Sequence, residues 1–389
     1  MNKSTFHVAT LMALLLVAVG AGTVSCISTD FFYNPEDIFY TPESLQDTPE
    51  TPKEIPDTKK GNDKILEKSG DTTWPLLSKA EIKRMMRETD HSNVPASNVD
   101  TGEDYMEQLP RFTPPYSAGK PKKAVLELAV ARTNFVRRLA GLNEVVHNED
   151  MSRVAQHGAW VSAKDNKIDH NISAYTRPAG VSDEMWNLAN DGVRLANLFR
   201  RPRAVQSVDV YMSDNGNPTL GHRFGVLSGI VSRVGFGVAS SNTGFGATSM
   251  RYNFVKQKDG IVVNDDKPDN WDIVAWPTPG YFPVNTQLFD AYVDQARWSI
   301  RFNQKKYKIE SDTRVAVTRT GSVTETWSFG APNNADLRLI GGDTYIFYKG
   351  GAKYADGDVF TVRINNIRDV QSNKKINLLY KVQFFDATK

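Results

Sequence analysis

The spacing of apolar residues predicts that the middle of the chain is helical. Between residues 122 and 142 apolar side chains recur every three or four positions, and Gly141 is a suitable stop signal, so this run predicts a helix. The same spacing predicts a second helix over 149–164. Shorter helical turns fit 183–189 and 193–199. A helical segment therefore occupies the centre of the sequence.

Strand-like patterns follow the helical segment. The runs 234–241 and 249–255, separated by a glycine-containing loop, predict a hairpin. Beyond the proline-rich stretch 277–283, short alternating runs are separated by turn residues, which is typical of a small β-sandwich of about a hundred residues. We therefore predict an α+β chain with a helix-containing domain at 120–280 and an all-β sandwich domain at 281–389.

Aromatic residues of the second domain fall at alternating strand positions. We interpret them as core residues, and a carbohydrate-binding platform is the alternative. The residues concerned are Trp298, Trp327, Tyr345, Phe347 and Phe360.

The N-terminus has the pattern of a targeting segment. A lysine precedes an apolar run at 8–19, which is too short to span a bilayer and is typical of a signal-peptide core. Small residues then lead to Cys26, the only cysteine of the chain. This arrangement resembles the lipobox of bacterial lipoproteins, in which the cysteine is acylated, although Thr23 stands where leucine is commonest. The alternative is an ordinary signal peptide cleaved nearby.

Residues 1–26 are therefore expected to direct the chain out of the cytoplasm, secreted or lipid-anchored at the bacterial cell envelope, with the membrane as a partner. With a single cysteine, no disulfide can form within the mature chain. Residues 27–119 are rich in Pro, Thr, Glu, Asp and Lys and poor in apolar residues, which predicts a disordered tether. A short helix over 77–88 is an alternative within it.

Charge and motif content exclude several classes of function. Lys plus Arg number 47 and Asp plus Glu 45, so no strongly basic face is implied and nucleic acid is not an expected partner. The sequence contains no GxSxG elbow, HExxH helix, phosphate loop or dinucleotide fingerprint. Because the lone cysteine is at the anchor position, Cys–His catalysis is excluded in the mature domain.

A set of distinctive residues runs through residues 122–280. The set comprises Asn134 and Arg137 in the first helix, the triplet Gly221, His222 and Arg223, and Gly235 and Gly237 in the run VGFGV. Their order and spacing resemble the CAP superfamily (cysteine-rich secretory, antigen 5 and pathogenesis-related, or SCP-like, proteins), in particular bacterial extracellular members with an appended C-terminal β-domain. The resemblance covers about two-fifths of the chain.

The resemblance implies an α-β-α sandwich with a cleft in which two histidines and two acids converge. Carried over to this chain, three of the positions are His170, Asp214 and His222, while Trp186 stands where the fourth, acidic residue is expected. Imidazole and carboxylate suit a divalent metal such as Zn²⁺, and three protein ligands plus water are typical of a catalytic zinc site. A missing acid also fits a cleft that no longer binds metal, unless Glu184 substitutes.

Structural interpretations remain open for the same residues. His222 is either a cleft ligand or a histidine packed at a helix start, and Asp214 begins DNGN, which is also turn chemistry. Gly221 is expected to allow a tight turn into the helix, whereas Gly235 and Gly237 are expected to thin a strand where a helix approaches.

Three functions follow from this pattern. We favour a secreted or surface-anchored CAP-domain lipoprotein that acts as a binding module for a lipid, a partner protein or a divalent metal. One alternative is a metal-dependent hydrolase, a peptidase, that uses the cleft histidines. The other is a structural or adhesive surface protein that acts through the β-domain.

Overall fold

The structure is a computed structural model, and it describes residues 63–65, 77–93, 103–229, 231–252, 254–257, 260–263, 271–284, 286–289, 297–329, 337–340, 342–349 and 352–389. The expected signal peptide, Cys26 and much of the expected tether lie outside the described residues. None of the helices in the described part of the chain is long and apolar enough to cross a membrane.

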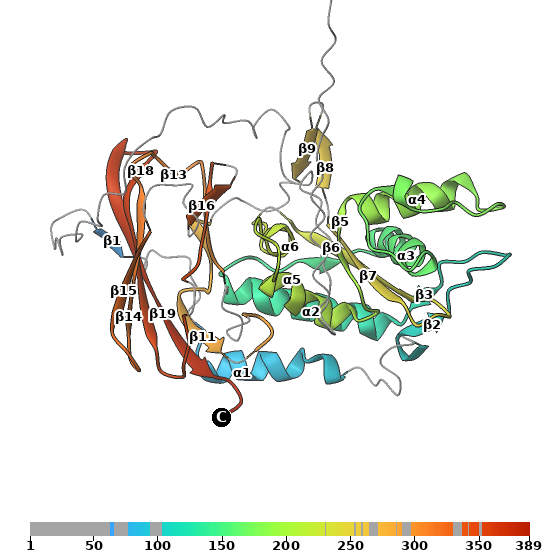
Figure 1. Ribbon diagram of the computed structural model, residues 1–389, viewed down its shortest axis with the longest axis horizontal. Helices are drawn as coiled ribbons and strands as arrows, with labels where there is room; N and C mark the ends of the chain where they lie inside the picture. The colour runs from blue at the N-terminus through green and yellow to red at the C-terminus, as the bar shows by residue number, and fades with distance from the viewer. Residues whose placement is uncertain are drawn as a thin grey trace, which may run out of the picture.

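The helices lie mainly in the first half of the described chain (Figure 1). They are α1 (Lys79–Glu88), α2 (Lys123–Leu139), α3 (Glu149–Lys164), α4 (Asp183–Arg194), α5 (Ala204–Ser213) and α6 (Gly221–Val226), with 3-10 turns at His91–Asn93, Glu103–Tyr105 and Ile172–Ala174. The prediction of a mixed α+β chain is confirmed. Helix α3 has the predicted bounds, and Gly141 follows α2 in the left-handed region, with φ of 73°.

One segment that was expected to be helical forms a strand instead. Residues 193–199 contain the end of α4 and then β5 (Ala196–Phe199), which pairs antiparallel with β7 (Gly246–Tyr252). All four residues of β5 are buried, and a fully buried apolar run has no periodicity that separates a strand from a helix. The helical prediction for 193–199 was therefore wrong over β5.

The helical part is built around a four-stranded sheet. Its order is β4 (Val146–His147), β6 (Arg233–Ser240), β7 and β5. Strand β4 runs parallel to β6, whereas β6 and β7 form the predicted antiparallel hairpin. Helices cover both faces of this sheet, with α3 and α4 on one side and α2 and α5 on the other (Figure 1).

Two glycines of β6 allow α3 to lie directly on the sheet. A Cβ atom at Gly235 would overlap the backbone nitrogen of Ser152, and one at Gly237 would overlap that of Gln156. The close approach that was expected at both glycines is observed. The intervening residue Phe236 is fully buried on the opposite side, in the core shared with α2 and α5.

The second half of the described chain consists mainly of strands in two further sheets (Figure 1). The large sheet has the order β1 (Asp63–Ile65), β19 (Lys374–Asp386), β18 (Val359–Asp369), β14 (Arg314–Thr320) and β15 (Glu325–Phe329), with β11 (Gly280–Val284) also paired to β19 and β13 (Tyr307–Lys308) to β18. The small sheet has the order β10 (Ile273–Trp276), β12 (Trp298–Phe302), β17 (Thr344–Phe347) and β16 (Leu337–Ile340). Two short hairpins complete the strands, β2 (Met106–Gln108) with β3 (Lys120–Pro121) and β8 (Phe254–Gln257) with β9 (Gly260–Val263).

Aromatic residues fill the core of this β part. Phe289 packs edge-on against Trp298, and Trp298 lies 5.5 Å from Phe360, measured between ring centroids. All five aromatics for which a surface platform was the alternative are buried. Their interpretation as core residues is confirmed.

The expectation of disorder over 27–119 was wrong for the described residues 63–65, 77–93 and 103–119. Helix α1 begins with a capping box between Ser78 and Glu81 and buries Ile82 and Met85 in the main core. Composition averaged over a long segment hides such a short amphipathic helix. The alternative of a helix over 77–88 is confirmed.

Helix α1 contacts both parts of the protein. Its C-cap residue Thr89 accepts a hydrogen bond from Arg132 of α2, at 3.2 Å. On its other side, Lys79 lies over the rings of Tyr281 and Phe385, and Lys83 donates to the backbone oxygen of Lys389. Helix α1 therefore packs across the boundary and connects the helical part to the β part.

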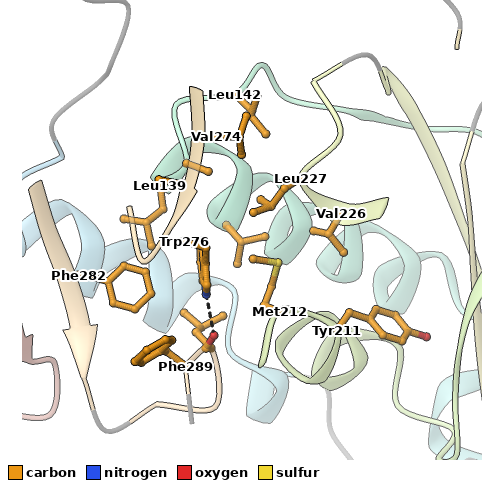
Figure 2. Packing of buried hydrophobic residues seen from close by; sticks show 14 of the residues in the cluster. Leu139, Leu142, Tyr211, Met212, Val226, Leu227, Val274, Trp276, Phe282 and Phe289 are labelled. Atoms are coloured by element: carbon orange, nitrogen blue, oxygen red, sulfur yellow. Dashed lines mark hydrogen bonds between the residues drawn. The ribbon is translucent and has the colours of Figure 1, made fainter. Parts of the chain in front are cut away.

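One hydrophobic core runs through both parts. Figure 2 shows Met212 and Leu227 of the helical part in the same cluster as Trp276 of β10 and Phe282 of β11. The Nε1 of Trp276 donates to the backbone oxygen of Leu288, at 3.1 Å. The expected junction at 280–281 falls within β11, and β10, which precedes it, pairs with β12 of the β part.

Candidate functional site

The carboxylate of Asp214 lies at the start of α6 and is completely buried. Its Oδ1 accepts from Nδ1 of His222 at 2.8 Å, and its Oδ2 accepts from the backbone nitrogens of His222 and Arg223 at 3.0 and 3.2 Å. Helix α6 has no capping side chain of its own, because its N-cap residue is Leu220. Asp214 therefore caps this helix from the end of α5 and places a negative charge at the positive end of its dipole.

His222 is held tightly in the first turn of α6. An ionised carboxylate can only accept hydrogen bonds, so Nδ1 of His222 donates to Asp214 and the ring is held with Nε2 on its other side. The ring stacks on Tyr211, with centroids 5.3 Å apart and an angle of 19° between the planes. Only 4% of the residue is exposed, which corresponds to a histidine packed at a helix start.

The turn into α6 is made by Leu220 and not by Gly221. Leu220 adopts the left-handed conformation, with φ of 54°, whereas the backbone of Gly221 is in the ordinary region. A Cβ atom at Gly221 would meet Nδ2 of Asn217 at an ordinary distance of 3.7 Å. The expectation that Gly221 supplies the tight turn was therefore wrong.

Arg223 links the two parts of the protein. Its Nε donates to the backbone oxygen of Met212 at 2.7 Å, at the end of α5, and its Nη1 donates to the backbone oxygen of Arg297 at 2.9 Å and to Oγ of Ser299 at 3.2 Å. Burial lowers the pKa of Arg223 to about 9, against the raising effect of the nearby Asp214 carboxylate. The guanidinium thus stays charged at neutral pH and ties α5 and α6 to β12.

Arg137 binds the other end of α6. Its Nη1 donates to the backbone oxygens of Val226 and Ser228, both at 2.8 Å, and its Nη2 donates to that of Val231 at 3.1 Å. Burial lowers the pKa of Arg137 to about 10. A cation at the C-terminal end and a carboxylate at the N-terminal end both complement the dipole of α6.

Asn134, one turn before Arg137 on α2, fixes the segment that leads into β4. Its side chain donates from Nδ2 to the backbone oxygen of Val145 at 2.9 Å and accepts from the backbone nitrogen of Val145 at 2.8 Å. The side-chain amide therefore pairs with the backbone as a neighbouring strand would.

His170 is not part of this cluster. Its Nδ1 lies 2.7 Å from the backbone oxygen of Val193, at the end of α4. Within the described ranges, no group of three His, Cys, Asp or Glu side chains is arranged to hold a metal ion. The structure brings Asp214 and His222 together, but the expectation of a three-ligand set that includes His170 was wrong. The reason is that the Asp214 carboxylate accepts from backbone N–H groups of α6, whereas the ring of His170 binds a backbone oxygen at the end of α4.

The residue at the position expected for a fourth ligand packs against the core. Trp186 on α4 is half-buried and packs against the smaller core cluster that contains Trp160. Glu184, the possible substitute, has a side chain that is 80% exposed and pairs with Arg153 at 3.5 Å. Glu184 therefore points to solvent.

Sequence reasoning missed two residues, Asn197 and Tyr252, that complete the surroundings of His222. Asn197 of β5 donates from Nδ2 to the backbone oxygen of His222 at 2.9 Å and to the hydroxyl of Tyr252 at 2.5 Å. Tyr211 donates to the backbone oxygen of Asn197 at 3.1 Å, and burial raises the pKa of both tyrosines. Because Asn197 and Tyr252 are far from His222 in sequence, no local spacing could have indicated this network.

The arrangement has a limited chemical capability. A carboxylate that fixes one nitrogen of a histidine orients the other as a metal ligand or a general base. Here both residues of the pair are buried, and the carboxylate also serves two backbone N–H groups. The main role of these contacts is therefore to fix the position of α6.

Comparison with known proteins gives little beyond this geometry. No protein-family model and no curated protein matches the chain. A solved structure described as the CAP domain of Enterococcal PrgA is similar to it, with a TM-score of 0.26 and 14% sequence identity, over 52% of this chain and 91% of that chain. A likeness at this level carries no argument about ligand or activity.

Proposed function

We propose that this chain is an extracytoplasmic CAP-like protein with an appended β-sandwich, lipid-anchored at the bacterial cell envelope through Cys26, and that it works by binding. The order of the motif residues and the placement of helices on both faces of the β4-β6-β7-β5 sheet support a CAP-like α-β-α sandwich. The partner is a lipid, a protein or another surface ligand that an anchored module meets outside the cell.

This proposal is supported by the contacts of the motif side chains, which bind other groups of the same chain. Asn134, Arg137, Asp214 and Arg223 all bind backbone groups of the chain itself, and Asp214 and Arg223 also bind the side chains of His222 and Ser299. Three of these four are almost completely buried, and only Asn134 is half-buried. Side chains bound in this way maintain the fold, so the outer surfaces are left to perform the function.

A metal-dependent hydrolase is the second candidate. The observation that favours it is the hydrogen bond that Nδ1 of His222 donates to Asp214, because the same contact orients histidines in zinc sites. The candidate requires further ligands, and the contacts of Asp214 with α6 compete with that role.

Elemental analysis of the purified full chain separates the two candidates. We expect less than stoichiometric zinc, manganese or iron after incubation with these metals, and no chelator-sensitive peptide hydrolysis. His222→Asn retains a side-chain donor toward Asp214, and His157→Asn on α3 is the matched control. Stoichiometric metal that disappears in His222→Asn and persists in His157→Asn, together with peptide hydrolysis that a chelator abolishes, would favour the hydrolase candidate over binding alone.

A further inference from the structure

Strand β1 comes from the N-terminal segment that was expected to be a tether, yet it belongs to the large sheet (Figure 1). Its three residues pair parallel with β19, with Asp63 opposite Asn377 and Ile65 opposite Leu379. Among the described strands, β1 is the end member of the order β1-β19-β18-β14-β15. The chain therefore attaches its own N-terminal segment to an edge of the β part.

Strand β11 occupies the same edge of β19 and provides a direct comparison. It also runs parallel to β19, but it pairs over five residues, from Gly280 opposite Val382 to Val284 opposite Asp386. Strand β18 pairs with β19 opposite both of them, so β1 and β11 lie on one side of β19 and β18 on the other. The two short strands share partner, edge and direction, and they differ in length.

The two strands also differ in how the chain holds them. Strand β10 ends at Trp276, four positions before β11 begins, and Phe282 of β11 is completely buried in the main core. By contrast, the next described element after β1 is α1, which begins at Lys79, 14 positions after Ile65. Strand β11 is therefore tied closely to a neighbouring strand, whereas β1 is joined to the next element through a longer stretch of chain.

A three-residue parallel strand is weakly held. It can form only a few ladder hydrogen bonds, and each contributes little in net terms because water offers the same groups other partners. These bonds are opposed by the loss of backbone freedom in the residues that become ordered. Opening of β1 leaves the ladder between β18 and β19 intact, since that ladder lies on the other side of β19. We propose that β1 is a releasable clasp, which pairs with β19 and detaches from it while the rest of the protein stays folded.

In an anchored chain, the clasp sets the reach of the protein from the membrane. Strand β1 is the first described element after Cys26, the proposed site of the anchor, so a pull between anchor and protein acts on β1 first. Release of β1 adds the 16 positions from Asp63 to Lys79 to the linking segment. A chain of that length spans at most about 55 Å when extended. This consequence rests on the proposed function, whereas the opening of β1 does not.

Hydrogen exchange of the full chain, followed by mass spectrometry of its peptides, tests the opening. We expect the amides of 63–65 to exchange about 10- to 100-fold more slowly than those of an unstructured peptide, as for a strand that opens locally. The amides of β11 are the matched control at the same edge and should exchange at least about 1,000-fold more slowly than the peptide. Equal protection of β1 and β11 would make β1 a permanent strand, and unprotected β1 amides would exclude the clasp, so either result overturns the proposal.

A disulfide across the register tests the pairing itself. Asp63→Cys with Asn377→Cys places thiols on directly paired residues, and Cys26→Ser in the same chain removes the competing thiol. Oxidation should slow exchange in 63–65 to the level of β11, and reduction should restore it. Asp63→Cys with Thr326→Cys, on β15 at the other end of the strand order, is the control and should form no disulfide within one chain. Equal yields of the two disulfides would contradict the clasp.

Neutron reflectometry of the lipidated chain on a supported bilayer separates the clasp from the anchor. With Cys26 retained, the variant Asp63→Cys, Asn377→Cys should stand closer to the bilayer when oxidised than when reduced. Equal heights of the two forms would overturn the role of the clasp in setting the reach. A chain that does not stay on the bilayer, although β1 exchanges as expected, would instead reject the proposed anchor and leave the opening of β1 established.

Discussion

At the scale of single residues, α6 is the centre of the site. Asp214 and Arg137 hold its two ends, and Arg223 connects it to β12. The helix has only six residues, so it has little stability of its own. The polar contacts with these three side chains therefore determine its position.

Substitution of Asp214 by Asn tests the role of the carboxylate. The change removes the charge that pairs with His222 and caps α6, so we expect the free energy of unfolding to fall by about 2–3 kcal/mol. Urea unfolding followed by circular dichroism measures this change. Asp150→Asn, at an exposed position in the first turn of α3, should cost less than about 1 kcal/mol. Equal effects of the two substitutions would contradict the structural role of Asp214.

At the scale of elements, close packing depends on glycine where α3 crosses β6. Gly237 lies against the backbone of Gln156, and Gly158 of α3 lies against the backbone of Gly192 of α4. Helix α3 is therefore fixed from both sides by contacts that leave no space for a side chain.

Alanine substitutions distinguish packing from turn geometry among the motif glycines. Gly237→Ala forces a Cβ atom into the backbone of α3, and we expect a loss of about 2–3 kcal/mol or more. Gly221→Ala places its Cβ at ordinary contact distance from Asn217 and Thr219, on a helix, and should be neutral or stabilising by up to about 1 kcal/mol. Thermal unfolding of both variants measures the difference. A larger loss at Gly221 would show that the turn into α6 is not made as described.

The elements also show what the sequence could predict. Helix α3 was predicted with its correct bounds because exposed and buried positions alternate along its first half, although residues 158–163 are all buried. Helix α5 was missed because seven of its ten residues are buried, which removes that periodicity. The pair of Asp214 and His222 was anticipated from the resemblance to the CAP superfamily, whereas the contact of Arg223 with Arg297, 74 positions away, was not. Only the folded chain reveals contacts of the second kind.

At the scale of the whole molecule, the helical part and the β part share one core. Helix α1, the pairing of β10 with β12 and the contacts of Arg223 all cross between them. The buried pair of Arg132 and Asp209, with two hydrogen bonds of 2.7 and 2.9 Å, joins α2 to α5 beneath α1. The two parts should therefore unfold together.

Calorimetric unfolding of the full chain and of Arg223→Met tests the central claim that the motif residues join the two parts. We expect one cooperative transition for the unmodified chain. In the variant we expect a loss of about 3–5 kcal/mol or a division into two transitions, since buried carbonyl groups lose their cationic partner. Arg138→Met, at an exposed position on α2, is the control and should leave the transition unchanged. An Arg223→Met variant that unfolds like the unmodified chain would contradict the account.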